Sequence, residues 1–207
     1  MATRENLIRL IVKGDPTAFH AFCNELEDAD LDVSGATFRK LRLSGFDLSN
    51  FNLSATEWEE CDFSSLRLDG ANLADSYLHG CSFVDILANA ASFEGAALEG
   101  SILKRAALTD CNFTSSEFTS NQHQDCIFSG GIFEELAWAE LTFEGGSWAD
   151  ISDFSGELRS VHLRDVSLED VDLSEAEVSR CFHQNCTLNR AELPENFKPR
   201  SGRRRTV

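Results

Sequence analysis

The sequence predicts an all-β solenoid, and three regularities of spacing carry that prediction. From Val33 to Leu193 every fifth residue is a central position, and 29 of these 33 positions hold Leu, Phe, Trp or Val. Two residues before a centre lies a second, usually small or aliphatic residue, and eight of the thirteen glycines lie two residues after a centre. A period of five fits neither a helix, which repeats every 3.6 residues, nor a strand, which repeats every 2. The chain is therefore expected to coil, with two inward side chains on each short side and then a corner where Gly, Asn or Asp adopts a positive φ.

Stacking explains why such a repeat folds. One five-residue unit cannot bury its apolar side chains alone, whereas coils stacked on one another bury them in a continuous core. Four centres depart from the large apolar type, namely Ala88, His123, Asp153 and His183. Phe154 beside Asp153 and Phe182 beside His183 predict local slips in which the neighbouring ring turns inward. At the second inward place, Phe46 and Phe51 are larger than the other residues there.

The units "SGFDL", "SNFNL", "DGANL" and "TDCNF" resemble the A(D/N)LXX repeat of the pentapeptide-repeat family. The resemblance implies a right-handed quadrilateral β-helix with four units per coil, hence about eight coils that rise roughly 40 Å in all. Periodicity alone leaves three or four sides open. The column Phe93, Phe113 and Phe133 favours a coil of twenty residues, whereas Phe113, Phe128 and Phe143 fit a coil of fifteen.

The two ends of the chain differ from the repeat region 31–193. Residues 1–30 predict a short α-helical cap of two helices, the first with Thr3 as its N-cap and Gly14 at its end, the second with Asp15 as N-cap and Pro16 in its first turn. Such a cap covers the first coil and prevents end-to-end growth. Residues 194–207 are expected to form a basic, flexible C-terminal tail after a short capping stretch around Phe197.

Cysteine usage and the absence of a targeting signal predict a cytoplasmic protein. The seven cysteines are an odd number without the spacing of a secreted disulfide framework. The one early apolar run, from Leu7, is interrupted by Arg9 and is too short for a signal core or a membrane span.

We expect neither catalysis nor a metal or other cofactor. "CFHQNC", with Cys181, His183 and Cys186, is the best candidate for zinc. However, the six cysteines of the repeat region all occupy the small inward place, where a compact thiol packs as an apolar side chain. His123 and His183 lie three twenty-residue coils apart, too far to act together, and the chain contains no phosphate-binding loop or dinucleotide fingerprint.

Charge gives the functional signal. The chain has 35 acidic and 18 basic residues, a net charge of −17, and no Lys or Arg lies between Ala106 and Leu158. This segment supplies the predicted protein-binding acidic surface, made of Asp110, Glu117, Asp125, Glu134, Glu135, Glu140, Glu144, Asp150 and Glu157, with Asp153 as a further acid at a central place. Such a surface repels nucleic acid and attracts basic protein surfaces, including those that ordinarily bind nucleic acid.

Two functional hypotheses remain open. The resemblance implies that the rod is similar to a DNA duplex in shape and charge and occupies the DNA-binding saddle of DNA gyrase or topoisomerase IV, which would inhibit or protect the enzyme. The alternative is a general protein-interaction scaffold without a topoisomerase role, whose acidic excess keeps the rod soluble. A homodimer stays open, although the sequence shows no C-terminal dimerisation helix of the kind found in gyrase-directed members.

Overall fold

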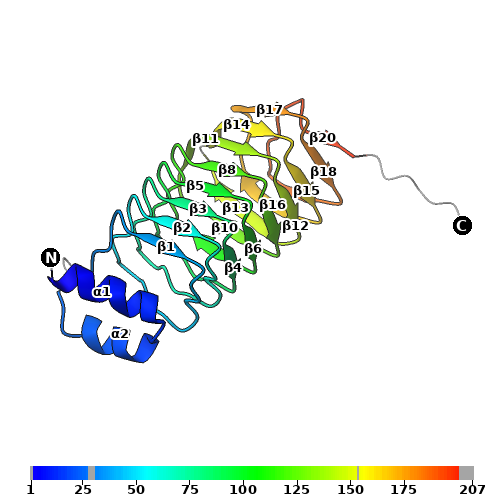
Figure 1. Cartoon of the computed structure of the whole chain (residues 1–207). Helices are drawn as coiled ribbons and strands as arrows, with labels where there is room; N and C mark the ends of the chain where they lie inside the picture. Colours follow the sequence, from blue (N-terminus) through cyan, green and yellow to red (C-terminus); the bar gives the residue numbers. More distant parts are fainter. Residues whose placement is uncertain (1, 28–30, 153, 201–207) are drawn as a thin grey trace, which may run out of the picture.

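The computed structural model describes residues 2–27, 31–152 and 154–200, and over this range the chain winds as a four-sided parallel β-solenoid (Figure 1). Bridges and strands pair residues twenty positions apart, as in Phe38↔Trp58 and Asn112↔Ile132, except at Phe133↔Phe154 and in the pairing of β18 (Phe182–Gln184) with β20 (Lys198–Pro199). A coil therefore has four sides of five residues, which resolves the choice between three and four sides. The predicted fold class, a quadrilateral β-helix of about eight coils with a helical cap, is confirmed.

We number the four faces in the order in which the chain visits them. Face I is the eight-stranded sheet of β1 (Thr37–Arg39), β2 (Glu57–Glu59), β3 (Tyr77–His79), β5 (Ala97–Glu99), β8 (Glu117–Thr119), β11 (Phe133–Ala139), β14 (Phe154–Arg159) and β17 (Ala176–Ser179). Face II contains β4 (Ser82–Val84), β6 (Ile102–Lys104), β9 (Gln122–Gln124), β12 (Thr142–Glu144), β15 (His162–Arg164), β18 (Phe182–Gln184) and β20 (Lys198–Pro199).

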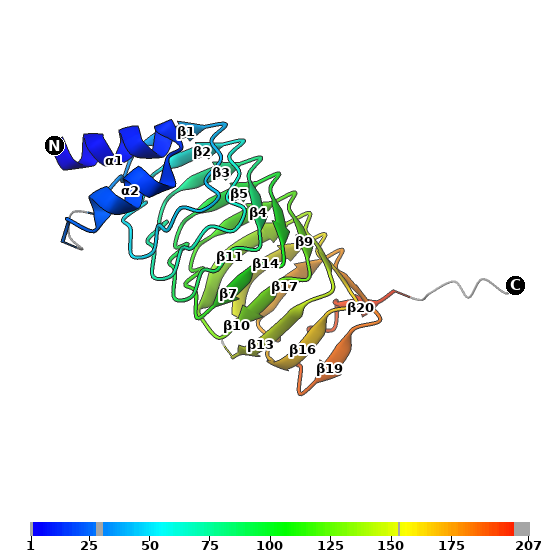
Figure 2. The ribbon, with the colours of Figure 1, turned by 90° about the horizontal axis from the view of Figure 1, so that it is seen from below.

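Face III contains β7 (Ala107–Thr109), β10 (Ile127–Ser129), β13 (Ser147–Ile151), β16 (Ser167–Val171) and β19 (Thr187–Asn189), which stack along one side of the molecule in Figure 2. Face IV is held by isolated bridges that run from Asp32↔Asn52 to Asp172↔Glu192. Each face is taken to include the residues on either side of its centre and the corner residue that follows.

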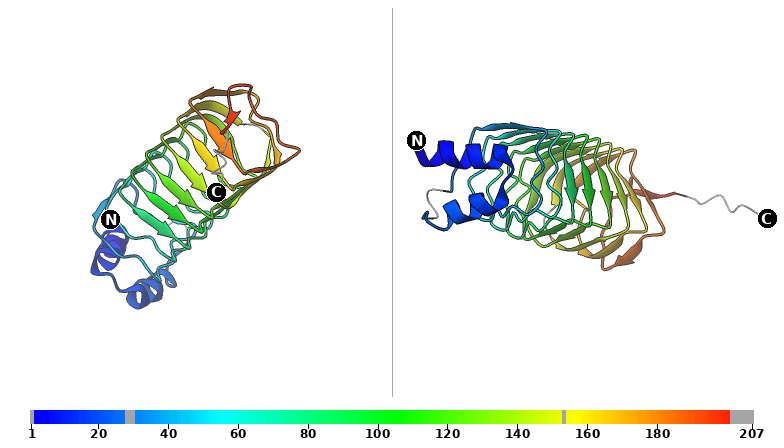
Figure 3. Two further views of the ribbon diagram at one scale, coloured as in Figure 1. Left: turned by 90° about the vertical axis from the view of Figure 1, so that its right-hand side faces the viewer. Right: turned by 60° about the horizontal axis from the view of Figure 1, so that its bottom comes forward.

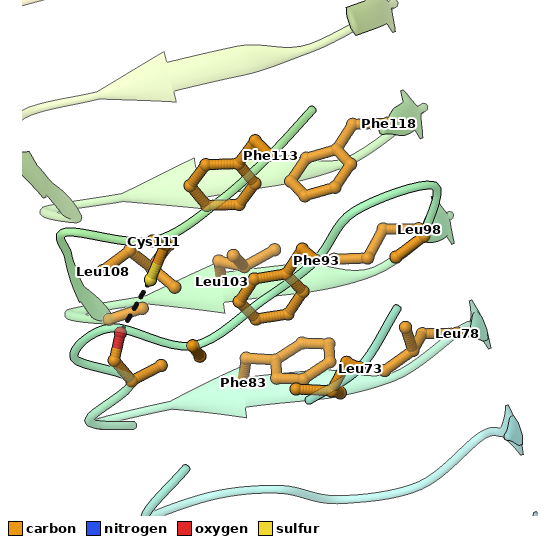
Figure 4. Close-up of a cluster of buried hydrophobic side chains, with 14 of the residues drawn as sticks. Leu73, Leu78, Phe83, Phe93, Leu98, Leu103, Leu108, Cys111, Phe113 and Phe118 are labelled. Carbon is orange, nitrogen blue, oxygen red and sulfur yellow. Dashed lines mark hydrogen bonds between the residues drawn. The ribbon is translucent and has the colours of Figure 1, made fainter. Parts of the chain in front are cut away.

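The core is a set of stacked columns of central side chains. Figure 4 shows Leu73 and Phe93 below Phe113, with Leu78, Leu98 and Phe118 in the neighbouring column. The Phe93 and Phe113 rings are stacked with centroids 5.3 Å apart. Cysteine side chains occupy several of the smaller inward places. Five of the six repeat cysteines are buried, and Cys186, in the last coil, is half-buried. The thiol of Cys111, for example, donates a hydrogen bond to the carbonyl oxygen of Ala88, 2.8 Å away (Figure 4).

The corners adopt positive φ as predicted, but the range of residue types is wider than predicted. Among the described residues, twenty-two other than glycine have a positive φ, and all of them lie two residues after a centre; they include Lys40, Glu60 and Arg105. The left-handed conformation costs an L-residue roughly 1–2 kcal/mol. Inter-coil hydrogen bonds oppose this cost, such as the one from the Lys40 N–H to the Glu59 carbonyl oxygen at 2.9 Å.

Of the two slips that the sequence predicts, one occurs. Phe133 pairs with Phe154 while Leu136 pairs with Gly156, so the register shifts between them, and Phe154 is buried with its ring stacked on Phe133. The prediction of a slip at Phe182 is wrong, because strands β15 and β18 pair without a register shift and the Phe182 side chain stays 38% exposed. His183 remains at the central position and is half-buried, and the centroid of its ring lies 6.0 Å from that of Phe197. Asp153 itself lies outside the described residues.

Two helices cover the first coils, at the end of the rod opposite the C-terminus (Figure 3). Helix α1 spans Ala2–Lys13, so Thr3 lies within it and is not its N-cap, contrary to the prediction. Helix α2 spans Pro16–Cys23, and the carboxylate of Asp15 accepts a hydrogen bond from the Ala18 N–H at 3.0 Å, as an N-cap should.

In the part of the chain that the structure describes, no helix has the length and apolar character that a membrane span requires. At the other end of the rod, the N–H of Arg200 bonds to the His183 carbonyl oxygen, and the remainder of the predicted basic tail, residues 201–207, lies outside the described residues.

Candidate functional site

The nine acidic residues predicted as a binding surface are all exposed, but the fold does not bring them to one face. A coil of twenty residues carries a continuous stretch of sequence around the whole circumference. The nine residues are therefore divided between face I (Glu117, Glu140, Glu157), face II (Asp125, Glu144), face III (Asp110, Asp150) and face IV (Glu134, Glu135).

Ion pairs reduce the negative charge on faces I to III. Most partners are about twenty residues apart, because they occupy the same or neighbouring columns of consecutive coils. Glu144 lies 3.5 Å from Arg164 on face II, and Arg39 lies 3.0 Å from Glu59 on face I. Within residues 31–193, face I carries eight acidic and four basic residues, face II five and four, and face III six and two.

Face IV differs from the other three because it carries acidic residues and no Lys or Arg. Its eight acids are Asp32, Asp75, Glu94, Glu134, Glu135, Asp172, Glu175 and Glu192. None of them forms an ion pair with a residue that the structure describes. At its N-terminal end, Arg4 of α1 donates a hydrogen bond to the Ser34 carbonyl oxygen, two residues from Asp32. The rest of the face is an uncompensated negative surface.

The register shift near Phe154 makes a hollow in this face. The hollow has a volume of about 380 Å³, and its lining includes the carboxylates of Glu134, Glu135, Asp172 and Glu175. The hydroxyl and the N–H of Ser174 both bond to Asp172, the latter at 2.8 Å, and hold the pKa of that carboxyl below its usual value. Four acidic side chains therefore surround this depression, an arrangement that suits a basic side chain.

The residues considered for metal binding and catalysis are occupied by packing. The Cys181 thiol donates to the Leu158 carbonyl oxygen at 3.1 Å. Burial raises the pKa of the Cys181 thiol, which favours the protonated form, whereas metals bind the thiolate. Burial lowers the pKa of His123 to about 3, and its two ring nitrogens have no hydrogen-bond partner among the residues that the structure describes. Over the described ranges, no three His, Cys, Asp or Glu side chains are grouped as metal ligands.

The fold and surface define a class, a capped four-sided β-solenoid with one strongly acidic face. A family model described as pentapeptide repeats matches residues 47–85 and 91–120, in eight copies. Over these residues the chain carries pentapeptide repeats, as the resemblance of its units indicated.

Several solved structures are similar to the chain. HetL, a pentapeptide repeat protein involved in heterocyst differentiation regulation from the cyanobacterium Nostoc sp. strain PCC 7120, is 17% identical, with a TM-score of 0.46 over 78% of this chain and 86% of its own. A trypsin-treated form of QnrB1, a plasmid-mediated fluoroquinolone resistance protein, is 16% identical, with a TM-score of 0.35 over 76% and 84%. Rfr23, a pentapeptide repeat protein from the cyanobacterium Cyanothece 51142, is 18% identical, with a TM-score of 0.24 over 62% and 95%. No curated protein matches the sequence.

Face IV was not identified as the acidic face from the sequence, although the positions of its acidic residues in the sequence indicate it. Asp75, Glu94, Asp172, Glu175 and Glu192 lie outside the segment that lacks basic residues. Grouping the outward positions that are multiples of twenty residues apart, instead of reading them consecutively, separates these acids from the basic residues.

Proposed function

We propose that this pentapeptide-repeat protein is a non-enzymatic binding protein that docks a basic protein surface through its acidic faces, with face IV as the principal one. The observation that carries the proposal is that face IV holds eight acidic residues and no Lys or Arg along the length of the rod. A field of one sign along a rigid surface attracts a partner of opposite charge and accelerates its association.

The sharpest candidate partner is a type II topoisomerase such as DNA gyrase, with the rod acting as a DNA mimic. Residues 31–193 carry 28 acidic and 10 basic residues, a net charge of −18. Eight coils at the spacing of neighbouring strands give a length of roughly 40 Å, hence about one net charge per 2.2 Å. Duplex DNA carries one charge per ~1.7 Å of its axis. A saddle built to bind DNA therefore meets a comparable charge density here, and face IV alone carries eight of the negative charges.

A supercoiling assay with purified gyrase tests this candidate. We expect the protein to inhibit supercoiling, or to protect the enzyme from a fluoroquinolone, at low salt, and we expect the effect to fade at moderate salt because exposed charges are screened. A variant neutralised on face IV (Glu134→Gln, Glu135→Gln, Asp172→Asn, Glu175→Gln) should need at least tenfold more protein for the same effect.

The matched control neutralises the same number of charges on face I (Glu57→Gln, Glu117→Gln, Glu157→Gln, Glu177→Gln) and should retain most of the effect. No effect of the unmodified protein at micromolar concentration would refute the topoisomerase role. Equal loss in the two variants would show that total charge, and not face IV, decides binding.

A further inference from the structure

The C-terminal end of this acidic chain is strongly basic. Five basic residues, Lys198, Arg200, Arg203, Arg204 and Arg205, fall within eight positions, and no acidic residue follows Glu195. Lys198 and Arg200 are exposed, and no ion pair of either is found among the described residues. The chain therefore carries, in one short segment, the type of ligand that an acidic face attracts.

The fold brings the start of this segment to the last coil. After Glu192, which bridges to Asp172 on face IV, the chain passes β17 on face I, where Pro194 and Asn196 line a shallow hollow with Glu177. It then pairs with β18 on face II through Lys198 and Pro199. The ninth turn is thus described over faces I and II, and seven residues follow Arg200.

These seven residues are long enough to return to face IV. An extended chain spans up to about 3.3 Å per residue, so Arg203 to Arg205, which follow Arg200 by three to five residues, reach roughly 10 to 17 Å from it. The solenoid itself needs only five residues for each side. Continuing from face II, the segment can cross the end of face III and arrive at the border of face IV.

Unpaired negative charge at this end of the rod lies mainly on face IV. On face III, Arg190 already bonds to Asp170 and lies 3.6 Å from Glu169. On face II, Glu144 faces Arg164. On face I, the acids alternate with Arg159 and Arg180. Asp172, Glu175 and Glu192 on face IV form no ion pair with a described residue, and Glu134 and Glu135 complete the 380 Å³ hollow two coils away from Glu175.

We infer that the arginine-rich C-terminal segment, Arg203–Arg205, docks on the C-terminal end of face IV of its own molecule, beside Asp172, Glu175 and Glu192. In this position the segment neutralises part of the acidic face. On the proposed function, a basic partner then has to displace it, so the segment acts as an internal competitor. The contact itself does not depend on the identity of that partner.

Zero-length cross-linking in the full chain tests the contact directly. Arg204→Lys places a primary amine in the segment, and a carbodiimide joins an amine to a carboxylate only where the two are in contact. Peptide mapping of the monomer band should find position 204 linked to Asp172, Glu175 or Glu192. The links should disappear at 0.5 M salt, which screens exposed charges. Lys40 and Glu60, 3.4 Å apart, provide an internal positive control.

The two neutralised variants provide matched controls in the Arg204→Lys background. The face IV variant should lose the links and the face I variant should keep them. Links distributed over faces I and III, links confined to a dimer band, or none while Lys40 is linked to Glu60 would each overturn the inference. These outcomes do not involve gyrase, so failure of the docking and failure of the topoisomerase role are distinguishable.

A binding measurement tests the competition. Fluorescence anisotropy of labelled nona-arginine at low salt should show several-fold tighter binding when Arg203, Arg204 and Arg205 are replaced by Gln. The gain should vanish in the face IV variant and persist in the face I variant. An equal gain in both would mean that net charge alone controls binding, and would contradict an occupied face IV.

Discussion

His123 occupies a central place on face II between Leu103 and Phe143, with which it pairs in consecutive coils. Its ring lies 4.1 Å from that of Phe143, and its exposure is 2%. A buried ring with two unpartnered nitrogens destabilises the core, because these atoms lose their hydrogen bonds to water and gain none. Leu103 and Phe143 pack against the imidazole ring but offer its nitrogens no hydrogen-bond partner.

Replacing this ring should stabilise the protein. His123→Leu is expected to raise the free energy of unfolding at pH 7 by about 1–3 kcal/mol. Because burial lowers the folded-state pKa to about 3, the unfolded state binds one more proton below its ordinary pKa of about 6.5, and the wild type loses stability as the pH falls from there. The variant lacks this loss, up to ~1.4 kcal/mol per pH unit. Urea unfolding between pH 7 and pH 4 measures this loss of stability. If the free energy of unfolding changed with pH in the same way in the two proteins, a lowered pKa of the buried His123 would be contradicted.

Gly146 shows why one inward place cannot carry a side chain. Its φ is +79°, and a Cβ there would lie 2.0 Å from the Cys126 carbonyl oxygen of the coil below. Gly146→Ala should therefore cost roughly 2–4 kcal/mol, from backbone strain and overlap together. Gly100→Ala is the control: it has a φ of +60° at an ordinary corner with no atom within 4 Å, so about 1 kcal/mol is expected. Equal melting temperatures for the two variants would show that the coil can yield at residue 146.

At the scale of elements, the helical cap explains two residues that broke the pattern of small inward side chains. Phe46 and Phe51 lie in the first coils, and the buried Phe19 of α2 packs against them at centroid distances of 5.1 and 5.6 Å. The ring of His20 adds a bond by accepting from the Asp47 N–H at 3.0 Å. The first coil thus uses aromatic residues where it meets a helix instead of another coil.

Removing the anchor of the cap should release it. Phe19→Ala is expected to cost about 3–5 kcal/mol at this interface, because a buried ring is lost and its partners are left exposed. Hydrogen exchange should then speed up in α2 and in the first coil more than in the middle coils. Val12→Ala on α1, where the side chain is 54% exposed, should leave exchange nearly unchanged. Uniformly faster exchange along the whole rod would argue against a separable cap.

At the scale of the whole molecule, stability is a sum over neighbouring coils, so an end coil is held less firmly than a middle one. Face III shows the difference within one column. Leu108 is 2% exposed in the middle of the rod, whereas Leu188, at the same place in the last described coil, is 45% exposed. The N-terminal end is covered by helices, while Phe197 is buried over faces I and II at the other end.

This column gives a matched pair of substitutions. Leu108→Ala should lower the free energy of unfolding by about 2–5 kcal/mol, as for other buried leucines. Leu188→Ala should lower it by less than about 1 kcal/mol, because half of that side chain already contacts solvent. Chemical denaturation of both variants checks the difference. A cost at Leu188 similar to that at Leu108 would mean that something covers the last coil in solution.

The sequence by itself determined the winding of this protein, because the five-residue period, the small inward places and the corner residues are local and each unit repeats them. It also placed Phe154 in the core, since an acidic centre beside a large ring favours a slip of one residue. It could not decide the case of Phe182, where pairing with β15 outweighed the local preference. Nor did it identify the acidic face, because neighbours on a face are twenty residues apart, whereas a continuous acidic segment winds around all four sides. Only the stacking of coils assembled Glu134, Glu135, Asp172 and Glu175 around one hollow and left face IV without a basic residue.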